Sequence, residues 1–557
     1  MKYSKLALLV ASTIFATANV YASDENLATV NQTGEENKTT ITQQVNSSNN
    51  NAMVNQNQNL NEATIEQSNT SNTSAYIDQD GTHNIAGISQ HDATETSLAT
   101  INTVGSENMA NIEQRLNNRA SANAAVNQFG NNNEAQMLQD NADGAMSVIN
   151  QNGNSDFARV RNYLSDFANA EINQNGGSGD NNAFINQNHS DGATAAINQF
   201  GELNDADIEQ NTQNLGYSAT ASTTIATMNQ EGISNTGYIR QIADSNTADL
   251  FQLGNDNYAK IQQKDVNNTA DVDQLGNSDK AVVEQTGQDG SATIMQNGNT
   301  NNESYVYQGG FSNVVTVDQV GSGLIATVTQ SDFENFADVD QVGINNTADV
   351  NQSGSASGSA NSAIVDQAGD GDSATIVQVG NLNNAIVEQD SGSYGNIISI
   401  SQTGYNNYAG ASTEVGDNSS ITVVQQGDNN SVGNLSGAAN YYGANVGAGT
   451  FGSDNILTID QIGNDNKAYA DSSDTSSVVD IDQNGDINTA VAESWLGTDN
   501  DIMISQTGTL HNADVFVNGA GGNMVSITQT DMSNTANVTS IGSGNTATIV
   551  QGTVLLP

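Results

Sequence analysis

Residues 341–352 read Gln-Val-Gly-Ile-Asn-Asn-Thr-Ala-Asp-Val-Asn-Gln, and this stretch decides the fold. Its second half alternates between two faces, and one face carries Asn346, Ala348, Val350 and Gln352. Alternation of this kind predicts a short strand with one buried face and one solvent-exposed face. The Gln-x-Gly-x-x-Asn stretch predicts a tight turn, because Gly and Asn adopt positive φ at low cost. A helix would need apolar spacings of 3 and 4, which the sequence does not show.

The same unit recurs every 11 residues. Glutamines lie at six consecutive steps of 11 and, after one step of 12, at four more steps of 11. They are Gln230, Gln241, Gln252, Gln263, Gln274, Gln285, Gln296, Gln308, Gln319, Gln330, Gln341 and Gln352. Pairs such as Gln32/Gln43 continue the pattern toward the N-terminus, and Gln529 with Gln551 continues it toward the C-terminus. The repeat therefore covers nearly the whole chain after its first residues.

One unit cannot bury its Ala and Val side chains alone. Two units form a rung of about 22 residues, strand–turn–strand–turn, and stacked rungs bury continuous columns of Ala and Val/Ile. The sequence therefore predicts an all-β fold, a β-solenoid whose neighbouring rungs lie about 4.7–4.8 Å apart. Buried amides are costly unless they are hydrogen-bonded. We expect the inward Gln residues and Asn346 to form ladders, in which each amide donates to one rung and accepts from the other.

Composition narrows the function classes. Apolar residues make up 36% of the 557 residues, charged residues 13%, and Asn with Gln about a quarter. Such a polar composition is typical of disordered chains, but a disordered chain would not be expected to keep a strict 11-residue period. The chain has 12 basic and 62 acidic residues, which argues against binding to nucleic acid or to anionic membranes. It has no Cys, which excludes disulfides, thiolate metal sites and a Cys nucleophile.

The first residues form a targeting segment. Two lysines precede the mostly apolar stretch 6–15, and Val20-Tyr21-Ala22 places small residues where a signal peptidase needs them. We predict a secretory signal peptide over residues 1–22, cleaved after Ala22. No later stretch approaches the length needed for a membrane span.

Irregularities in the repeat divide the rest of the chain. We expect irregular repeats, with longer turns, over residues 23–229 and regular repeats over 230–352. Repeats with a Gly/Ser insert follow over 353–436, then a Gly/Ala-rich break over 437–455 and C-terminal repeats over 456–557. The inserts are interpreted as extended turns at a solenoid edge rather than as partner-binding loops.

Signals of catalysis are absent. The four histidines, His83, His91, His189 and His511, are never paired at ligand spacing and are expected at exposed positions. No phosphate-binding loop is present, and no cluster of aromatic residues for sugar stacking is evident. We therefore expect no enzyme activity, no cofactor and no dedicated metal site.

The frame Gln-x-Gly-x-x-Asn-x-Ala-x-(Val/Ile)-x-Gln, doubled into 22 residues, resembles the curlin repeat of curli amyloid fibre subunits. The resemblance covers most of residues 26–551. It implies export by a Gram-negative bacterium through a curli-type outer-membrane pore, a nucleator, and self-polymerisation into extracellular cross-β fibres for cell adhesion and the biofilm matrix. Two features depart from the family pattern: the chain is unusually long, and many units carry Gln at both turns where curlins alternate Ser with Gln.

An alternative is a soluble monomeric β-solenoid, either an adhesin or an ice-binding rod. Ice binders of this shape carry a regular Thr-x-Thr column, whereas the outward positions here mix Asp, Thr, Asn and Glu. The fibre interpretation is favoured because the repeats continue to both ends without an obvious polar cap, which soluble solenoids require.

Stacked acidic residues suggest how assembly is controlled. Outward residues 22 apart should lie on adjacent rungs, as in the pairs Asp249/Asp271 and Asp318/Asp340. Each like-charge pair at about 4.8 Å costs roughly 1 kcal/mol in water before salt screening. We hypothesise that acid or divalent cations, the candidate ionic partners, accelerate assembly by neutralising these columns.

Overall fold

A computed structural model describes residues 10–11, 17–21, 25–44, 46–92, 96–115, 121–176, 179–211, 224–298, 300–354, 356–433 and 447–552. The chain forms two compact units, Met1–Ser278 (unit 1) and Asp279–Pro557 (unit 2). The described residues contain strands and turns and no helix.

Unit 1 consists of two parallel sheets to which successive strands contribute in turn. Sheet A of unit 1 contains β1 (Val10–Ala11), β3 (Leu27–Thr33), β5 (Asn51–Asn57), β7 (Ser74–Thr82), β9 (Leu98–Ser106), β11 (Asn123–Asn131), β13 (Met146–Asn152), β15 (Asn169–Asn175), β17 (Thr194–Glu202), β19 (Ile225–Ile233), β21 (Thr247–Asn255) and β23 (Thr269–Gln274). Sheet B of unit 1 contains β2 (Thr17–Tyr21), β4 (Lys38–Gln44), β6 (Glu62–Ser68), β8 (Ile85–His91), β10 (Met109–Arg115), β12 (Glu134–Asp140), β14 (Phe157–Tyr163), β16 (Asn182–Asn188), β18 (Asp205–Asn211), β20 (Thr236–Gln241) and β22 (Tyr258–Gln263).

Unit 2 repeats this arrangement. Its sheet A contains β25 (Ser291–Gln296), β27 (Val314–Ser322), β29 (Phe336–Ile344), β31 (Ser362–Gln367), β33 (Asn384–Gln389), β36 (Tyr408–Thr413), β39 (Ser431–Val432), β40 (Gly447–Thr450), β42 (Lys467–Ser472), β44 (Thr489–Trp495), β46 (Asn512–Gly521) and β48 (Thr535–Ser543). Its sheet B contains β24 (Lys280–Gln285), β26 (Glu303–Gln308), β28 (Ile325–Gln330), β30 (Thr347–Ser353), β32 (Ser373–Asn381), β35 (Ile397–Tyr405), β38 (Ser420–Gln426), β41 (Ile456–Ile462), β43 (Val478–Asp486), β45 (Asp501–Thr509), β47 (Met524–Met532) and β49 (Thr546–Gln551). The short strands β34 (Ser393–Tyr394) and β37 (Gly416–Asp417) pair with each other.

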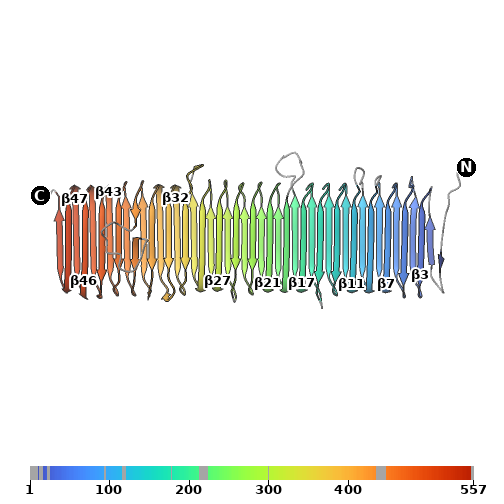
Figure 1. The fold of residues 1–557 in the computed structure, drawn as a ribbon, viewed down its shortest axis with the longest axis horizontal. Helices are drawn as coiled ribbons and strands as arrows, with labels where there is room; N and C mark the ends of the chain where they lie inside the picture. Colours follow the sequence, from blue (N-terminus) through green and yellow to red (C-terminus); the bar gives the residue numbers. More distant parts are fainter. Residues whose placement is uncertain are drawn as a thin grey trace, which may run out of the picture. The chain divides into compact units, whose positions relative to one another are not determined.

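Within each unit, strands of one sheet pair in parallel and in register. Ala226 of β19 lies beside Ala248 of β21, and Gln230 lies beside Gln252 on the same two strands. The arrows of each sheet accordingly run side by side in Figure 1. Parallel pairing of strands one rung apart is the β-solenoid that the 11-residue unit predicts, and the predicted fold class is confirmed.

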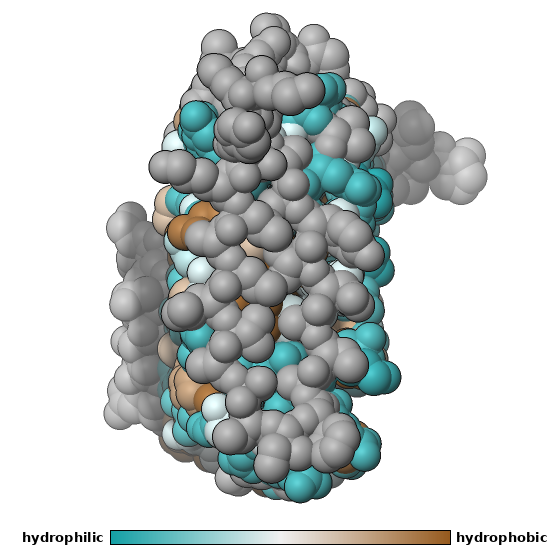
Figure 2. Space-filling model, turned by 90° about the vertical axis from the view of Figure 1, so that its right-hand side faces the viewer, coloured by the Kyte–Doolittle hydropathy of each residue, from teal (hydrophilic) through white to brown (hydrophobic). Residues whose placement is uncertain are grey.

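The core consists of the inward columns of small and branched apolar residues. In β30, Ala348, Val350 and Gln352 are buried, whereas Thr347, Asp349 and Asn351 face outward, as the alternation predicts. In Figure 2, which looks onto the end near the N-terminus, the coloured residues around the grey ones are mostly hydrophilic, with separate apolar patches. Each rung therefore buries little apolar area by itself and depends on the rungs above and below it.

The turns between strands require glycine. Gly232 has φ +126°, and a Cβ on it would lie 1.8 Å from the carbonyl oxygen of Gly254 on the next rung. Gly105 and Gly201 have the same relation to the glycines stacked on them. The Gly of the Gln-x-Gly turn is thus fixed by both its left-handed backbone and the close approach of the adjacent rung.

Rung length varies, although paired strands keep one register except at the end of β46 and β48. Stacked glutamines are 22 residues apart at Gln230/Gln252, 31 apart at Gln199/Gln230 and 36 apart at Gln425/Gln461. The irregular repeats predicted over 23–229 stack on the regular ones, because β17 pairs with β19 and β18 pairs with β20. The extra residues of the 31-residue step lie between β18 and β19, whereas those of the 36-residue step interrupt a strand, because β39 and β40 both pair with β36 and with β42.

Two predicted features lie partly or wholly outside the described residues. The cleavage position Ala22 lies outside the described residues, and the short strands β1 and β2 pair with β3 and β4 from within the predicted signal peptide. Of the predicted break over 437–455, residues 447–455 are described. They include β40, which pairs with β36 and β42.

Replacing the turn glycine Gly232 with Ala should destabilise the solenoid. The new Cβ must displace the Gly254 carbonyl or force a backbone change, at a cost of about 2–4 kcal/mol in the free energy of unfolding. Denaturant unfolding of the freshly purified monomer would measure this. Gly309→Ala is the control, since its nearest contact for a Cβ is an ordinary 3.5 Å. Equal stability of the two variants would contradict the proposed turn constraint.

Candidate functional site: stacked amide columns and outward faces

The inward amides predicted from the sequence all lie in the core. Each predicted Gln is the last inward residue of a strand, where the chain turns toward the other sheet. The thirteen predicted residues, at most 3% exposed, are Gln230, Gln241, Gln252, Gln263, Gln274, Gln285, Gln296, Gln308, Gln319, Gln330, Gln341, Asn346 and Gln352.

In unit 1 the glutamines form one column in each sheet, interrupted by Thr103 in sheet A and by Asn162 in sheet B. In sheet A the Gln230 Nε2 donates to Gln252 Oε1 at 2.9 Å, and Gln252 Nε2 donates to Gln274 Oε1 at 2.8 Å. Each amide also donates across the core, as Gln252 Nε2 does to the Thr236 carbonyl of sheet B at 3.1 Å. Both N–H groups therefore have an acceptor, and the cost of burying the amide is offset.

In unit 2 the two columns differ. The sheet B column is continuous from Gln285 to Gln551, with every step between 2.8 and 3.1 Å. The sheet A column runs from Gln296 to Gln389 and then stops. The later strands carry Thr413, Thr450, Ser472, Ser494, Val517 and Ser540 at the same position. The amide column is therefore dispensable on one sheet while the other keeps it.

Asn346 bonds differently from the glutamines. Its Nδ2 donates to the carbonyls of Val342 and Gly369, and its Oδ1 accepts from the backbone N–H of Asp372 on the next rung. It thus ties the turn of its own rung to the turn and backbone of the adjacent one, rather than continuing an amide-to-amide ladder.

The outward faces stack acidic residues. Asp249 lies beside Asp271 on β21 and β23, and Asp318 lies beside Asp340 on β27 and β29. Burial raises the pKa of Asp318 above its usual value, and the Asp340 carboxylate raises it further. Burial and then Asp271 raise the pKa of Asp249 in the same way. The folded stack therefore binds protons more tightly than the unfolded chain does.

One buried acid with a strongly raised pKa lies on β42. Asp471 is 6% exposed, and burial, followed by the neighbouring Glu493, raises its pKa to about 7. Its charged form is thus disfavoured in the fold for the same reason as in the exposed columns.

Two sequence expectations about side chains are wrong. His511 is 1% exposed, because it occupies an inward turn position where its backbone N–H donates to Asn488 Oδ1. Aromatic residues do gather on the outward face of sheet B in unit 1. Their ring centroids are 5.3 Å apart for Phe157/Phe184 and 6.1 Å apart for Tyr238/Tyr258. Their outward strand positions are readable from the alternation, but their neighbours depend on rungs of unequal length.

Among the described residues, no group of three or more His, Cys, Asp or Glu side chains is arranged to hold a metal ion. The described part of the chain also contains no helix long and apolar enough to cross a membrane.

Comparison with protein families identifies the curlin associated repeat. It matches residues 267–298, 299–331, 358–390, 395–427 and 497–530. A comparison with curated proteins finds none that match the chain.

Removal of one column amide should weaken the stack. In Gln319→Ala the Gln296 amide loses its acceptor and the Gln341 carbonyl oxygen loses its donor, at a cost of about 2–4 kcal/mol in the free energy of unfolding. Chemical denaturation of the monomer would measure the change. Thr347→Ala, an outward change on β30, should have less than about 0.5 kcal/mol effect. Comparable losses for the two variants would contradict the role of the amide columns.

Acid should stabilise the solenoid over a defined range. Because the pKa of Asp318 is raised in the fold, stability should rise as pH falls from 7 toward the unfolded pKa near 4 and gain nothing further from this group below it. Asp318→Asn/Asp340→Asn should be more stable than the parent chain at pH 7 by about 0.5–1 kcal/mol at low salt and should have a shallower pH dependence. Thermal unfolding between pH 4 and 7 would show both effects. Asp256→Asn, in an exposed turn, is the control, and a parental slope in the double variant would refute the assignment.

Proposed function

This chain is a curlin-repeat protein, and on that premise we propose that it is a secreted structural subunit of a curli-like amyloid fibre. The curlin associated repeat and the β-solenoid are features of structural rather than catalytic proteins, and curlin repeats occur typically in extracellular or surface-associated bacterial proteins. In the proposal, chains add to one another rung on rung and form an extracellular fibre for adhesion and the biofilm matrix.

The observation that carries this proposal is the continuity of the parallel stack. Every rung presents strand edges with backbone N–H and C=O groups along its axis, and its inward amides need a partner in the next rung. A second copy in the same register offers the same backbone groups and the same amide column as an internal rung does. Addition of a copy therefore repeats an interaction that each unit already makes many times.

Several parts of the proposal come from the family resemblance alone. They are export through a curli-type outer-membrane pore, a nucleating partner, and localisation on the surface of a Gram-negative bacterium. The second candidate function, a soluble monomeric adhesin or ice-binding rod, keeps the same fold and differs in whether copies join end to end. The stacked acidic residues suit a fibre whose end-to-end joining is controlled, because their charge opposes premature association of copies.

Fibre diffraction tests the proposal directly. When the chain without its predicted signal peptide is diluted from denaturant, we expect sedimentable fibres. Their diffraction should show a meridional reflection near about 4.7–4.8 Å and an equatorial one near about 10 Å. Assembly should be faster at pH 4 than at pH 7, because protonation removes like-charge repulsion between stacked carboxylates. A chain that remains monomeric for days at both pH values and with Ca²⁺ would instead support the soluble rod.

A further inference from the structure

The few basic residues of this acidic chain are concentrated on one face. After residue 22 the chain has ten basic residues; six of them project outward from sheet B of unit 1, and four of these six lie between β14 and β22. Arg159 and Arg161 lie on β14, Arg240 on β20 and Lys260 on β22. The carboxylates between them are Asp205, Asp207 and Glu209 of β18, so this face carries a formal charge of +1. It is a local exception in a chain with a net charge of −50.

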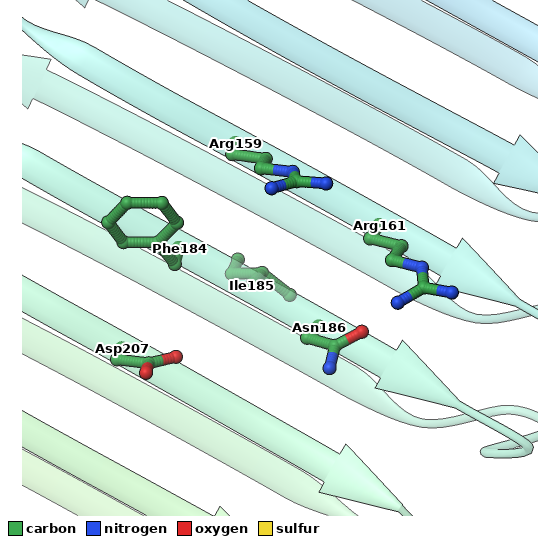
Figure 3. A pocket seen from close by; sticks show the side chains of 6 residues that line it. All are labelled: Arg159, Arg161, Phe184, Ile185, Asn186 and Asp207. Carbon is green, nitrogen blue, oxygen red and sulfur yellow. The ribbon is translucent and has the colours of Figure 1, made fainter.

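This face contains two neighbouring hollows. The first has a volume of about 220 Å³ and is lined by Arg159, Arg161, Phe184, Ile185, Asn186 and Asp207. Figure 3 shows both guanidinium groups on one strand, the Phe184 ring and the Asn186 amide on the next, and the Asp207 carboxylate on the third. The second, about 330 Å³, begins at the same Asp207 and extends to Tyr258 and Lys260. From β14 to β22 the face spans four rung steps, about 19 Å at the usual strand spacing.

The two arginines of the first hollow lack the ion pairs that the other described arginines of unit 1, Arg115 and Arg240, have. Arg240 pairs with Glu209 at 3.0 Å, and Arg115 pairs with Glu113 on its own strand. Within the described residues no carboxylate lies within ion-pair distance of Arg159 or Arg161. The Arg161 Nε is buried without a hydrogen-bond partner, and its guanidinium lies 5.2 Å from the Tyr163 ring centroid. Because no carboxylate lies within ion-pair distance of either guanidinium, their charge can pair with that of an anionic ligand.

The arrangement of chemical groups specifies the ligand. A guanidinium fork binds a carboxylate through two parallel hydrogen bonds. The Phe184 ring offers an apolar face to a sugar ring, and Asn186 and Asp207 can bind hydroxyl groups. We propose that this face of β14–β22 binds a polysaccharide that contains uronic acid residues, with a sugar carboxylate on Arg159 and Arg161 and the chain directed along the stack toward Lys260.

The carboxylates in the centre of the face distinguish this ligand from nucleic acid. A nucleic acid strand carries a phosphate on every nucleotide, and some of these phosphates would face Asp205, Asp207 or Glu209. A uronic acid polysaccharide has several hydroxyl groups on each ring, and these can donate hydrogen bonds to the same carboxylates. At physiological salt the acidic columns elsewhere are screened beyond about 8 Å, so the local groups decide binding.

The inference goes beyond the proposed fibre function, because binding can be measured on the monomer. Isothermal titration calorimetry of the freshly purified full-length chain, at pH 7 and 0.15 M salt, would use a galacturonic acid hexasaccharide and a neutral galactose hexasaccharide as probes. We expect the acidic probe to bind and the neutral probe to bind at least tenfold more weakly. Failure of the chain to form fibres would leave this result unaffected.

Variants locate the binding to the first hollow. Arg159→Ala/Arg161→Ala should weaken binding of the acidic probe at least tenfold, and Phe184→Ala should weaken it about fivefold through lost stacking. Arg159→Lys/Arg161→Lys, which keeps the charge but not the fork, should have intermediate affinity. Lys38→Ala/Lys467→Ala removes the same charge from strands outside the hollow and should bind as the parent chain does.

Four outcomes would overturn the proposal. One is absence of binding by the parent chain, and another is parental affinity in Arg159→Ala/Arg161→Ala. The third is that the face joins copies of the chain to one another. Sedimentation velocity would then show self-association that Arg159→Ala/Arg161→Ala abolishes, and the acidic probe would not bind. Tighter binding of single-stranded DNA than of the hexasaccharide would be the fourth such outcome. Circular dichroism of each variant confirms that lost binding is not lost folding.

Discussion

A buried side-chain amide needs hydrogen-bond partners from other residues, and this requirement organises the chain. Gln252 illustrates it: its oxygen accepts from Gln230 one rung away, and its nitrogen donates to Gln274 on the other side and to Thr236 across the core. Each rung is therefore incomplete without two neighbours. Because the partner must have the same group at the same height, the constraint enforces parallel, in-register stacking. Apolar burial supplies much of the driving force, but the amides select the register.

The turn glycines follow from that register. Stacked rungs bring the carbonyl of Gly254 so close to Gly232 that a side chain has no room there. Asn346 uses the same closeness to bond the backbone of the next rung. Where sheet A of unit 2 loses its glutamines after Gln389, short hydroxyl side chains and Val517 take the position, while the sheet B column continues to Gln551. The fold therefore persists in this part of unit 2 with an amide column in one sheet only, together with the apolar core.

The outward faces are free of this constraint, and their residues differ from rung to rung. Most accumulate carboxylates, whose stacking in register gives a cost that protonation relieves. One face of unit 1 departs from the rule and gathers arginines with aromatic rings. An inner face that repeats suits the proposed assembly along the axis, and outer faces that vary suit the proposed recognition at the side.

The fold and the inward columns could be predicted from sequence because they depend on local period alone. The alternation Asn346, Ala348, Val350 and Gln352 and the 11-residue spacing of glutamines determine which residues face inward. The neighbours of an outward residue depend instead on rung length. Arg240 lies beside Glu209, 31 positions earlier, because a long turn intervenes, and a fixed step of 22 cannot place this pair. Strand positions, the inward face and the core residues all follow from this local pattern. That Arg159, Phe184 and Asp207 lie together follows only from the stacking, since turns of unequal length set which strands become neighbours.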